Sequence, residues 1–301
     1  MTTVAVVGAG GWGTALAVLL ARAGVRTVLW ARRPEAAAEI ESARENRRLL
    51  PGVAFPPSLL VTDSLVRAAT EAGDALVFAV PSHGLREVAG RVEWGAAGSA
   101  LLVSAVKGFE VGSGLRPSQI IEAAAGRAAG AVCVLSGPSH AEEVGRGIPT
   151  AVVAASLQAA EAERVQAIFH AQRFRVYTHP DPLGVELAGA FKNVIAIACG
   201  IADGLGFGDN TRAALITRGL VEMSRLGSAL GGRRDTFNGL AGLGDLVVTC
   251  TSGYSRNRRG FAELARRLPA ANLFSLAHRR PLAERLCLHQ ALLFGVAGLL
   301  P

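Results

Sequence analysis

The sequence has few aromatic residues and few cysteines. Phe, Trp and Tyr supply 5% of the 301 residues, whereas glycine occurs 36 times, which suits tight turns and close approach of a ligand better than an aromatic core. The four cysteines form no CxxC pair and each lies in an apolar run: Cys133, Cys199, Cys250 and Cys287. We therefore expect free, mostly buried thiols in a reducing compartment and no metal site.

Recognisable targeting and membrane-spanning segments are also missing. The N-terminus has no charged region followed by an apolar one, as a signal peptide would have. The longest uncharged run near the C-terminus, 288–301, is too short to cross a bilayer. These absences predict a globular cytoplasmic protein without a membrane span, and its length allows two domains.

Acidic residues are fewer than basic residues. The 31 Lys and Arg residues against 24 Asp and Glu residues give a net charge of +7, which favours an anionic partner. The arginines form only short clusters, at 32–33, 233–234 and 256–259, and no nucleic-acid-binding motif or set of stacking aromatics accompanies them. We favour a small phosphorylated ligand over nucleic acid; steeply salt-dependent DNA binding would support the alternative.

The first motif present is a glycine-rich turn near the N-terminus. An apolar strand, 4–7, runs directly into GAGGWG (8–13) and then into a helix, so G-x-G-x-x-G stands between strand and helix. Gly8 permits the tight turn, Gly10 lets a pyrophosphate approach the backbone, and Gly13 lets helix and strand pack closely. The pattern predicts a dinucleotide site at the N-terminus of that helix.

The end of the second strand bears on the choice of cofactor. This strand, Thr27–Trp30, is followed by Arg32 and Arg33, and no acidic residue occurs before Glu35. An acid here would accept a hydrogen bond from the 2′-hydroxyl of NAD, whereas arginine accommodates the 2′-phosphate of NADP. We expect a preference for NADP(H) over NAD(H), with two plain surface arginines as the alternative.

Three further apolar strands end in polar residues. The strands 75–80, 100–105 and 131–135 are the near-continuous apolar runs of a parallel sheet, and ligands bind outside the carboxyl ends of such strands. The side chains expected in that zone are His83, Lys107, Ser139 and His140. Lys107 is the best candidate because the neighbouring glycine leaves room for a ligand.

The second half of the chain is predicted to be helical. Strands at 150–154 and 174–177 flank a helix, and THPDP (178–182) then breaks the pattern. Helices are expected at 182–201, 211–230 and 236–249, together with a polar helix at 34–48 in the first half. The prediction is an α/β protein with an N-terminal Rossmann-like doubly wound parallel sheet (1–179) and an all-helical C-terminal domain (180–301).

An apolar stretch of small residues, 187–210, contains Lys192. Asp181 and Pro182 are the expected signals for the start of its helix. Lys192 has two interpretations: a side chain that extends to solvent along an apolar helix, or a lysine held in a cleft that exchanges a proton with a substrate.

Seven segments together resemble the bacterial NAD(P)-dependent glycerol-3-phosphate dehydrogenases. They are GAGGWGTALA (8–17), SAVKGFE (104–110), SGPSHAEEV (136–144), GAFKNVIAIACGIADGLGFGDN (189–210), TRAALITRGLVEMSRLG (211–227), GLAGLGDLVVTCTS (239–252) and SRNRRG (255–260). Many enzymes share the glycine-rich motif, but the run that begins KNVIA and the last two segments are specific to this family. The resemblance covers residues 4–260 or so, in the family's order.

The resemblance implies roles for individual residues. The cofactor would contact Gly8, Gly10, Gly11, Trp12, Gly13, Arg32, Arg33, Lys107, Ala141 and Arg256. The substrate would contact Lys107, Gly137, Ser139, Lys192, Asn193, Asp245, Ser255, Arg256 and Asn257. Catalysis would rest on Lys192 as proton donor and acceptor, Lys107 as added positive charge, and Asp245 as the group that orients Lys192 or the substrate.

The implied reaction agrees with the chemistry of these side chains. Hydride transfer to a ketone places negative charge on its oxygen, which a nearby lysine can protonate. A hydroxyl, a guanidinium and an amide in sequence at 255–257 suit a phosphate dianion. The resemblance thus implies reversible reduction of dihydroxyacetone phosphate to sn-glycerol 3-phosphate, the precursor of the glycerophospholipid backbone, by a homodimer that prefers NADP(H) and accepts NAD(H).

The tail departs from the family pattern. From about Phe261 onward the sequence differs, as a truncation or a changed reading frame would produce, and 261–301 is expected to be atypical. An altered tail makes a catalytically impaired, cofactor-binding member of the same family one alternative. Independently of the tail, another β-hydroxyacid-type or ketone reductase of the same architecture is the second alternative; one that acts on a carboxylate substrate would not need the residues at 255–257.

Overall fold

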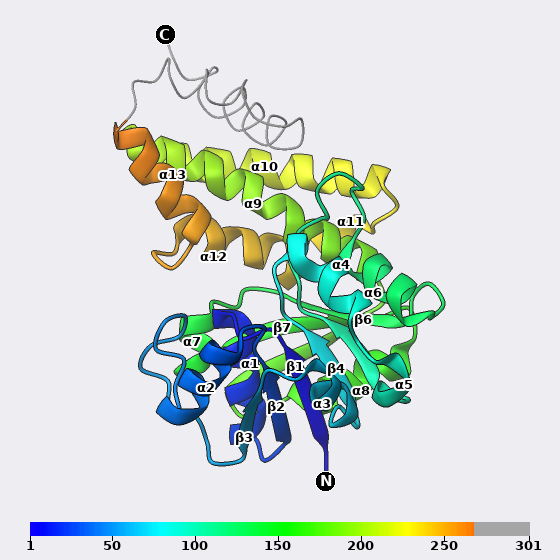
Figure 1. Cartoon of the computed structure of the whole chain (residues 1–301). Coiled ribbons are helices and arrows are strands. Elements are labelled where there is room, and N and C mark those ends of the chain that lie inside the picture. Colours follow the sequence, from blue (N-terminus) through cyan, green and yellow to red (C-terminus); the bar gives the residue numbers. More distant parts are fainter. Residues whose placement is uncertain (268–301) are drawn as a thin grey trace. The chain divides into compact units, whose positions relative to one another are not determined.

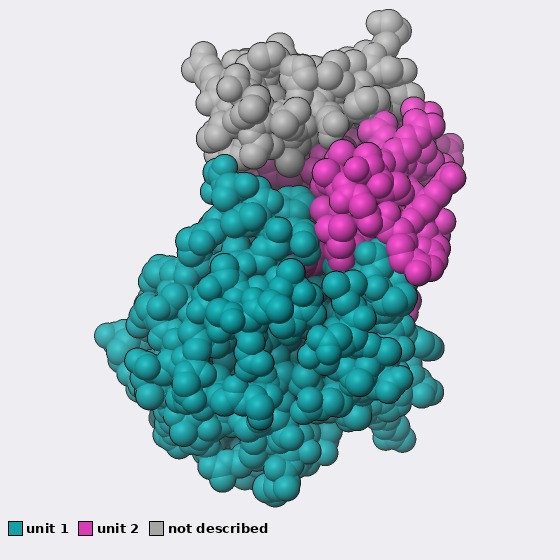
Figure 2. Space-filling view, turned by 90° about the vertical axis from the view of Figure 1, so that its right-hand side faces the viewer, with its two compact units in different colours: residues 1–182 teal, residues 183–301 magenta. Residues whose placement is uncertain are grey.

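The computed structural model describes residues 1–267 (Figure 1). The chain divides into two compact units, Met1–Pro182 and Leu183–Pro301, which are coloured separately in Figure 2. The predicted division into domains 1–179 and 180–301 stays a prediction.

The N-terminal unit is built on one sheet of eight strands in the order β3-β2-β1-β4-β5-β6-β7-β8. The strands are β1 Thr3–Val7, β2 Arg26–Trp30, β3 Leu59–Thr62, β4 Ala75–Phe78, β5 Leu101–Ser104, β6 Val132–Ser136, β7 Thr150–Ala155 and β8 Phe174–His179. The pairs among β1 to β6 are parallel, β7 runs antiparallel to β6, and β8 is parallel to β7. The strand order reverses between β1 and β4, the place where open α/β sheets bind ligands.

Helices cover both faces of this sheet because both faces of its strands are apolar. In β1, Val4 and Val6 join one buried cluster, while Ala5 and Val7 join the other. The first cluster is completed by α1 Gly11–Arg22, α2 Pro34–Ala43, α7 Ala141–Gly145 and α8 Ala159–Phe169, and the second by α3 Leu65–Thr70, α4 Ser82–Gly90, α5 Trp94–Ala97 and α6 Pro117–Ala125. The unit is a doubly wound α/β layer structure.

The C-terminal unit is helical throughout its described part. It contains α9 Pro182–Gly204, α10 Asp209–Ala229, α11 Arg234–Asn238, a π-helix Leu240–Gly244, α12 Asp245–Thr251 and α13 Arg256–Arg267 (Figure 1). Glycines on α9 bring α13 very close: a Cβ on Gly200 would lie 2.3 Å from the carbonyl oxygen of Arg258, and one on Gly204 would lie 2.5 Å from that of Ala262. The small residues of α9 therefore serve helix packing.

The predicted fold class is confirmed, with corrections to single elements. The helix expected at 34–48 ends at Ala43, because Arg44 adopts a left-handed conformation (φ 51°) and donates to the carbonyls of Pro56 and Leu59. The helix expected at 236–249 is interrupted at Gly239, which is extended. Strand β3 was not predicted, and the part of the atypical tail beyond residue 267 lies outside the described residues.

One described helix, α9, is long and apolar enough to span a membrane by length and composition. Its most apolar window has a mean hydropathy of 1.6, and 72% of that window is buried inside the protein. Burial of this extent is that of a core helix, and core helices share this length and apolar composition.

Candidate active site

The glycine-rich turn has the geometry that its sequence predicts. Gly8 has φ +122°, and a Cβ there would lie 2.8 Å from the carbonyl oxygen of Ala79. A Cβ on Gly13 would lie 1.9 Å from the carbonyl oxygen of Gly8, so helix α1 and strand β1 can approach only without it. Around Gly10, by contrast, no heavy atom of the described residues lies within 4 Å of an added Cβ. Protein atoms therefore fill the space next to Gly8 and Gly13, whereas the space next to Gly10 is open.

The N-terminus of α1 fits a dinucleotide. The helix begins at Gly11, and no side chain caps it, so its first backbone N–H groups can bind phosphate. The indole nitrogen of Trp12, in the first turn, is buried and has no hydrogen-bond partner within the described chain. A Cβ on Gly11 would lie 3.5 Å from the Cβ of Ala141, which places that predicted cofactor residue beside the turn.

Arg32 and Arg33 follow β2 and are exposed to solvent. Arg33 occupies the N-cap position of α2, and neither guanidinium forms an ion pair with the described residues. Both charges are therefore available to a ligand phosphate.

Lys107, Gly137 and Ser139 come together beyond the carboxyl ends of β5 and β6. The ammonium nitrogen of Lys107 donates to the carbonyl of Gly137 at 2.9 Å and lies 3.5 Å from the hydroxyl of Ser139. That hydroxyl donates to the same carbonyl at 2.9 Å. Gly137 has φ +140°, and a Cβ there would lie 3.0 Å from the Cα of Val152. The Gly137 carbonyl thus holds the ammonium group of Lys107. A larger residue at position 137 would displace this carbonyl and with it the lysine.

Lys192 is buried in the helical unit and paired. Its ammonium nitrogen lies 2.5 Å from Oδ1 of Asp245 and 2.9 Å from the hydroxyl oxygen of Thr249. The side chains of Lys192 and Asp245 are 8% and 2% exposed, which rules out a lysine that extends to solvent. A buried ion pair is stable only with such additional hydrogen bonds. The structure therefore supports the interpretation of Lys192 as a held, functional lysine.

Helix α12 supplies two partners of Lys192, Asp245 and Thr249. Asp245 is its first residue and Thr249 comes four residues later, so the two side chains lie on one face. The Thr249 hydroxyl donates to the carbonyl of Asp245 at 2.5 Å and accepts from Lys192. The π-helix Leu240–Gly244 directly precedes Asp245, and such wider turns are frequent at functional sites.

The predicted phosphate-binding residues surround the start of α13. Ser255 is buried, and its hydroxyl accepts from the backbone N–H of Arg258 at 3.3 Å, so it caps the helix. Asn257 donates to the side-chain oxygen of Asn193 at 3.0 Å, which ties α13 to α9 next to Lys192. Arg256 is exposed and forms no ion pair with the described residues. An exposed arginine at a helix N-terminus suits an anion.

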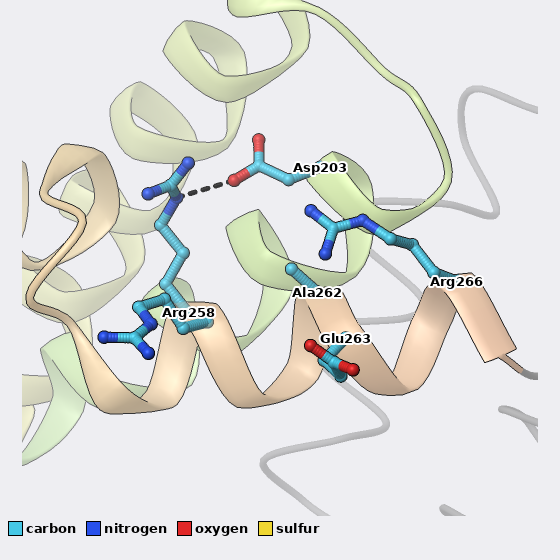
Figure 3. A pocket seen from close by; sticks show the side chains of 6 residues that line it. Asp203, Arg258, Ala262, Glu263 and Arg266 are labelled. Atoms are coloured by element: carbon cyan, nitrogen blue, oxygen red, sulfur yellow. Dashed lines mark hydrogen bonds and ion pairs between the residues drawn. The ribbon is translucent and has the colours of Figure 1, made fainter.

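The neighbouring Arg258 has a structural role instead. Figure 3 shows a pocket on the α9 side of α13, which is lined by Asp203, Arg258, Arg259, Ala262, Glu263 and Arg266. Asp203 accepts from Arg258 at 2.6 Å with one oxygen and from Arg212 at 2.6 Å with the other. Asp203 and Arg258 are thus engaged with each other, and none of the predicted substrate residues lines this pocket. We assign it to the packing of α10 and α13 on α9.

The described cysteines match the expectation of free, buried thiols. Cys133, Cys199 and Cys250 are free and buried. Burial raises the pKa of the Cys133 thiol to about 12. A hydrogen bond with the Cys199 thiol, and then burial, raise the pKa of Cys250. Cys287 lies outside the described residues. Among residues 1–267, no group of three His, Cys, Asp or Glu side chains is arranged to hold a metal ion.

The structure brings the predicted site residues together in two sets. The N-terminal unit holds the glycine-rich turn with Ala141, and Lys107 with Gly137 and Ser139. The C-terminal unit holds Lys192 with Asp245, and Asn193 with Asn257. The roles assigned to these residues stay predictions. Sequence reasoning missed Thr249, although its spacing of four from Asp245 on an apolar helix was a usable signal.

Comparison with known proteins finds two models, of the two parts of one protein family, that match this chain. The model for the N-terminus of NAD-dependent glycerol-3-phosphate dehydrogenase matches residues 3–162, and the model for its C-terminus matches residues 181–280. The second match corrects the expectation that similarity ends near Phe261, because it continues to residue 280.

Similar proteins include curated bacterial enzymes named glycerol-3-phosphate dehydrogenase (NAD(P)+). That of Pelodictyon phaeoclathratiforme is 53% identical over 265 residues, which are 87% of this chain and 79% of the relative. That of Pelotomaculum thermopropionicum is 55% identical over 257 residues, 85% of this chain and 73% of the relative. Among solved structures, glycerol-3-phosphate dehydrogenase from Coxiella burnetii superposes with a TM-score of 0.83 at 39% identity, covering 97% of this chain and 90% of that one.

Proposed function

Because the chain belongs to the NAD-dependent glycerol-3-phosphate dehydrogenase family, we propose that it reduces dihydroxyacetone phosphate to sn-glycerol 3-phosphate with NADPH or NADH, and catalyses the reverse reaction. The observation that carries this proposal is the buried Lys192, whose ammonium group is held by Asp245 and Thr249. A ketone reductase needs a positioned proton donor at the carbonyl oxygen, and this cluster supplies one.

The proposed steps use the chain's own residues. The glycine-rich turn at Gly8–Gly13 would hold the reduced nicotinamide cofactor, which would supply the hydride for C2 of the ketone. Lys192 gives its proton to the alkoxide oxygen, and Asp245 and Thr249 hold the ammonium group in one orientation meanwhile. In the reverse direction neutral Lys192 takes the proton from the C2 hydroxyl. Lys107, fixed by the Gly137 carbonyl, contributes positive charge toward the substrate.

The proposed phosphate site lies at the start of α13. Ser255 shapes the cap, Asn257 is anchored to Asn193, and Arg256 extends from the first turn a guanidinium that forms no ion pair within residues 1–267. Binding energy at the phosphate, remote from the reacting carbon, can position the carbonyl.

NADP(H) is the proposed preferred cofactor, and NAD(H) the accepted one. The support is the pair Arg32 and Arg33, both exposed directly after β2, where the adenosine 2′-phosphate binds in folds of this kind. The product, sn-glycerol 3-phosphate, would feed the synthesis of glycerophospholipids.

Location, assembly and domain limits are proposals as well. Free buried thiols at Cys133, Cys199 and Cys250 fit a reducing cytoplasm. A homodimer follows from the family resemblance, and light scattering behind a sizing column would measure it. The division into a dinucleotide-binding domain (1–179) and a helical domain (180–301) predicts that residues 1–179 expressed alone bind NADPH.

The proposed role of Lys192 is tested with two substitutions. Lys192→Ala removes the proton donor, and Lys192→Arg keeps a cation beside Asp245 that cannot deprotonate near neutral pH. We expect both to lower kcat by at least about 100-fold, because a positioned acid contributes that much. The dissociation constant of NADPH, from its fluorescence, should stay within about twofold, because no cofactor contact is assigned to Lys192. Near-normal turnover of Lys192→Ala would disprove the assignment.

A further inference from the structure

Asn46 is a buried polar residue to which the reaction gives no role. It lies in the segment between α2 and β3, and it is 2% exposed. Its side-chain amide nitrogen donates to the carbonyl of Ala9 at 3.0 Å and to the hydroxyl of Thr14 at 2.9 Å. Its side-chain oxygen accepts from the backbone N–H of Leu49 at 3.2 Å. Both amide protons are thus used, and both go to the glycine-rich turn or the helix that follows it.

The Ala9 carbonyl belongs to the same peptide unit as the N–H of Gly10. A trans peptide is planar, and its C=O and N–H point in opposite directions. The hydrogen bond from Asn46 therefore fixes where the Gly10 N–H points. This N–H lies at the open position of the turn, where no described heavy atom lies within 4 Å of an added Cβ. Asn46 orients one of the backbone donors that a pyrophosphate would meet.

The second hydrogen bond joins the turn to α1. Thr14 is fully buried in the first turns of α1, so Asn46 connects this helix to the peptide unit that precedes it. The same segment closes over the helix start: the Leu49 carbonyl lies 2.8 Å from a Cβ added at Gly11. The turn, the helix start and the segment 46–50 form one hydrogen-bonded unit.

We propose that Asn46 is a positioning residue that preorganises the glycine-rich turn for a dinucleotide pyrophosphate. The proposal rests on the proposed function insofar as that function requires NAD(P)H. Asn46 touches no reacting atom, so its effect falls on cofactor affinity. An aspartate of the same shape cannot replace it, because a carboxylate offers no proton to the Ala9 carbonyl.

The test compares Asn46→Asp, Asn46→Ala and Thr14→Val with the unaltered chain. The control is Gln166→Ala, which removes another side-chain amide that donates to a backbone carbonyl of the same unit, that of Val176 at 2.7 Å. NADPH affinity is measured by fluorescence titration, and KM and kcat are measured at saturating cofactor. Circular dichroism shows that each variant is folded.

We expect Asn46→Asp and Asn46→Ala to weaken NADPH binding by about tenfold or more, and Thr14→Val by about threefold, because each loses hydrogen bonds that orient the turn. At saturating NADPH, kcat and the KM for dihydroxyacetone phosphate should stay within about twofold of the unaltered values, and Gln166→Ala should bind NADPH normally.

Unchanged NADPH affinity in a folded Asn46 variant, or a loss equal to that of Gln166→Ala, would overturn the proposal. If both Asn46 variants fail to fold, Thr14→Val decides, and normal NADPH affinity there would overturn it. The unaltered chain is titrated first: failure to bind NADPH at all would overturn the proposed function and this proposal with it.

Discussion

The Lys192–Asp245 pair offers a stability test of the proposed proton donor. Its atoms lie 2.5 Å apart, and the two side chains are 8% and 2% exposed. Removing one partner leaves the other charge in a nearly water-free site, which costs about 3–5 kcal/mol. Replacing both residues with uncharged residues of similar volume leaves no buried charge and lowers the free energy of unfolding far less than a single replacement does. We therefore expect Lys192→Met and Asp245→Asn each to lower the free energy of unfolding by about 3 kcal/mol, and the double variant by about 1 kcal/mol.

The assay has to report on the helical unit alone. The three tryptophans, Trp12, Trp30 and Trp94, all belong to the N-terminal unit, so their fluorescence serves as the control. Hydrogen exchange of the amides of α9 and α12, followed by mass spectrometry, gives the local unfolding free energy. Strictly additive losses in the double variant would refute the account of a coupled buried pair, and with it the reason why Lys192 is held in place.

Three further predictions concern other charged groups. Hydrogen bonding to Arg86, and then to Ser113, lowers the pKa of Glu110 from 4.5 to about 2. The stabilisation by the Arg86–Glu110 pair is therefore present above pH 4.5 and is lost as the pH falls toward 2. Arg86→Ala should remove this dependence of the urea midpoint on acidic pH. Asp203→Asn leaves Arg212 and Arg258 without their shared carboxylate and should lower the free energy of unfolding by about 2 kcal/mol. It should also raise the KM for dihydroxyacetone phosphate, because the position of α13 is less fixed. An unchanged KM would show that the phosphate site does not depend on this ion pair. Replacing Arg32 and Arg33 with Ala should raise the KM for NADPH about tenfold and leave that for NADH within about twofold, whereas equal effects on both cofactors would contradict the proposed preference.

The N-terminal unit could be predicted because its signals are local. The glycine pattern beside an apolar strand specifies a turn, and buried parallel strands are apolar along their whole length. Strand β3, Leu59–Thr62, was missed because four residues after a proline-rich loop give too short a pattern. The antiparallel direction of β7 could not be read either, because apolar composition does not encode the direction of a strand.

The helical unit shows what a sequence pattern leaves open. Lys192 in an apolar helix admitted two interpretations, and only the position of α12 decides between them. Thr249 was missed because a threonine between valine and cysteine resembles an ordinary core residue. Its spacing of four from Asp245 indicates only that the two side chains share a helix face. That this face meets Lys192 depends on a contact over 57 residues of sequence, which no local pattern carries. Within the cluster at 256–259 the family resemblance singled out Arg256, and the structure adds that Arg258 is held by Asp203 while Arg256 is exposed.

The most direct test of the central claim is NADPH oxidation by the purified 301-residue chain with dihydroxyacetone phosphate, followed at 340 nm beside NADH. Unphosphorylated dihydroxyacetone is the matched control substrate. The account predicts oxidation that requires the phosphorylated ketone, with sn-glycerol 3-phosphate as product and a higher kcat/KM for NADPH than for NADH. Bound NADPH without any turnover of dihydroxyacetone phosphate would contradict it.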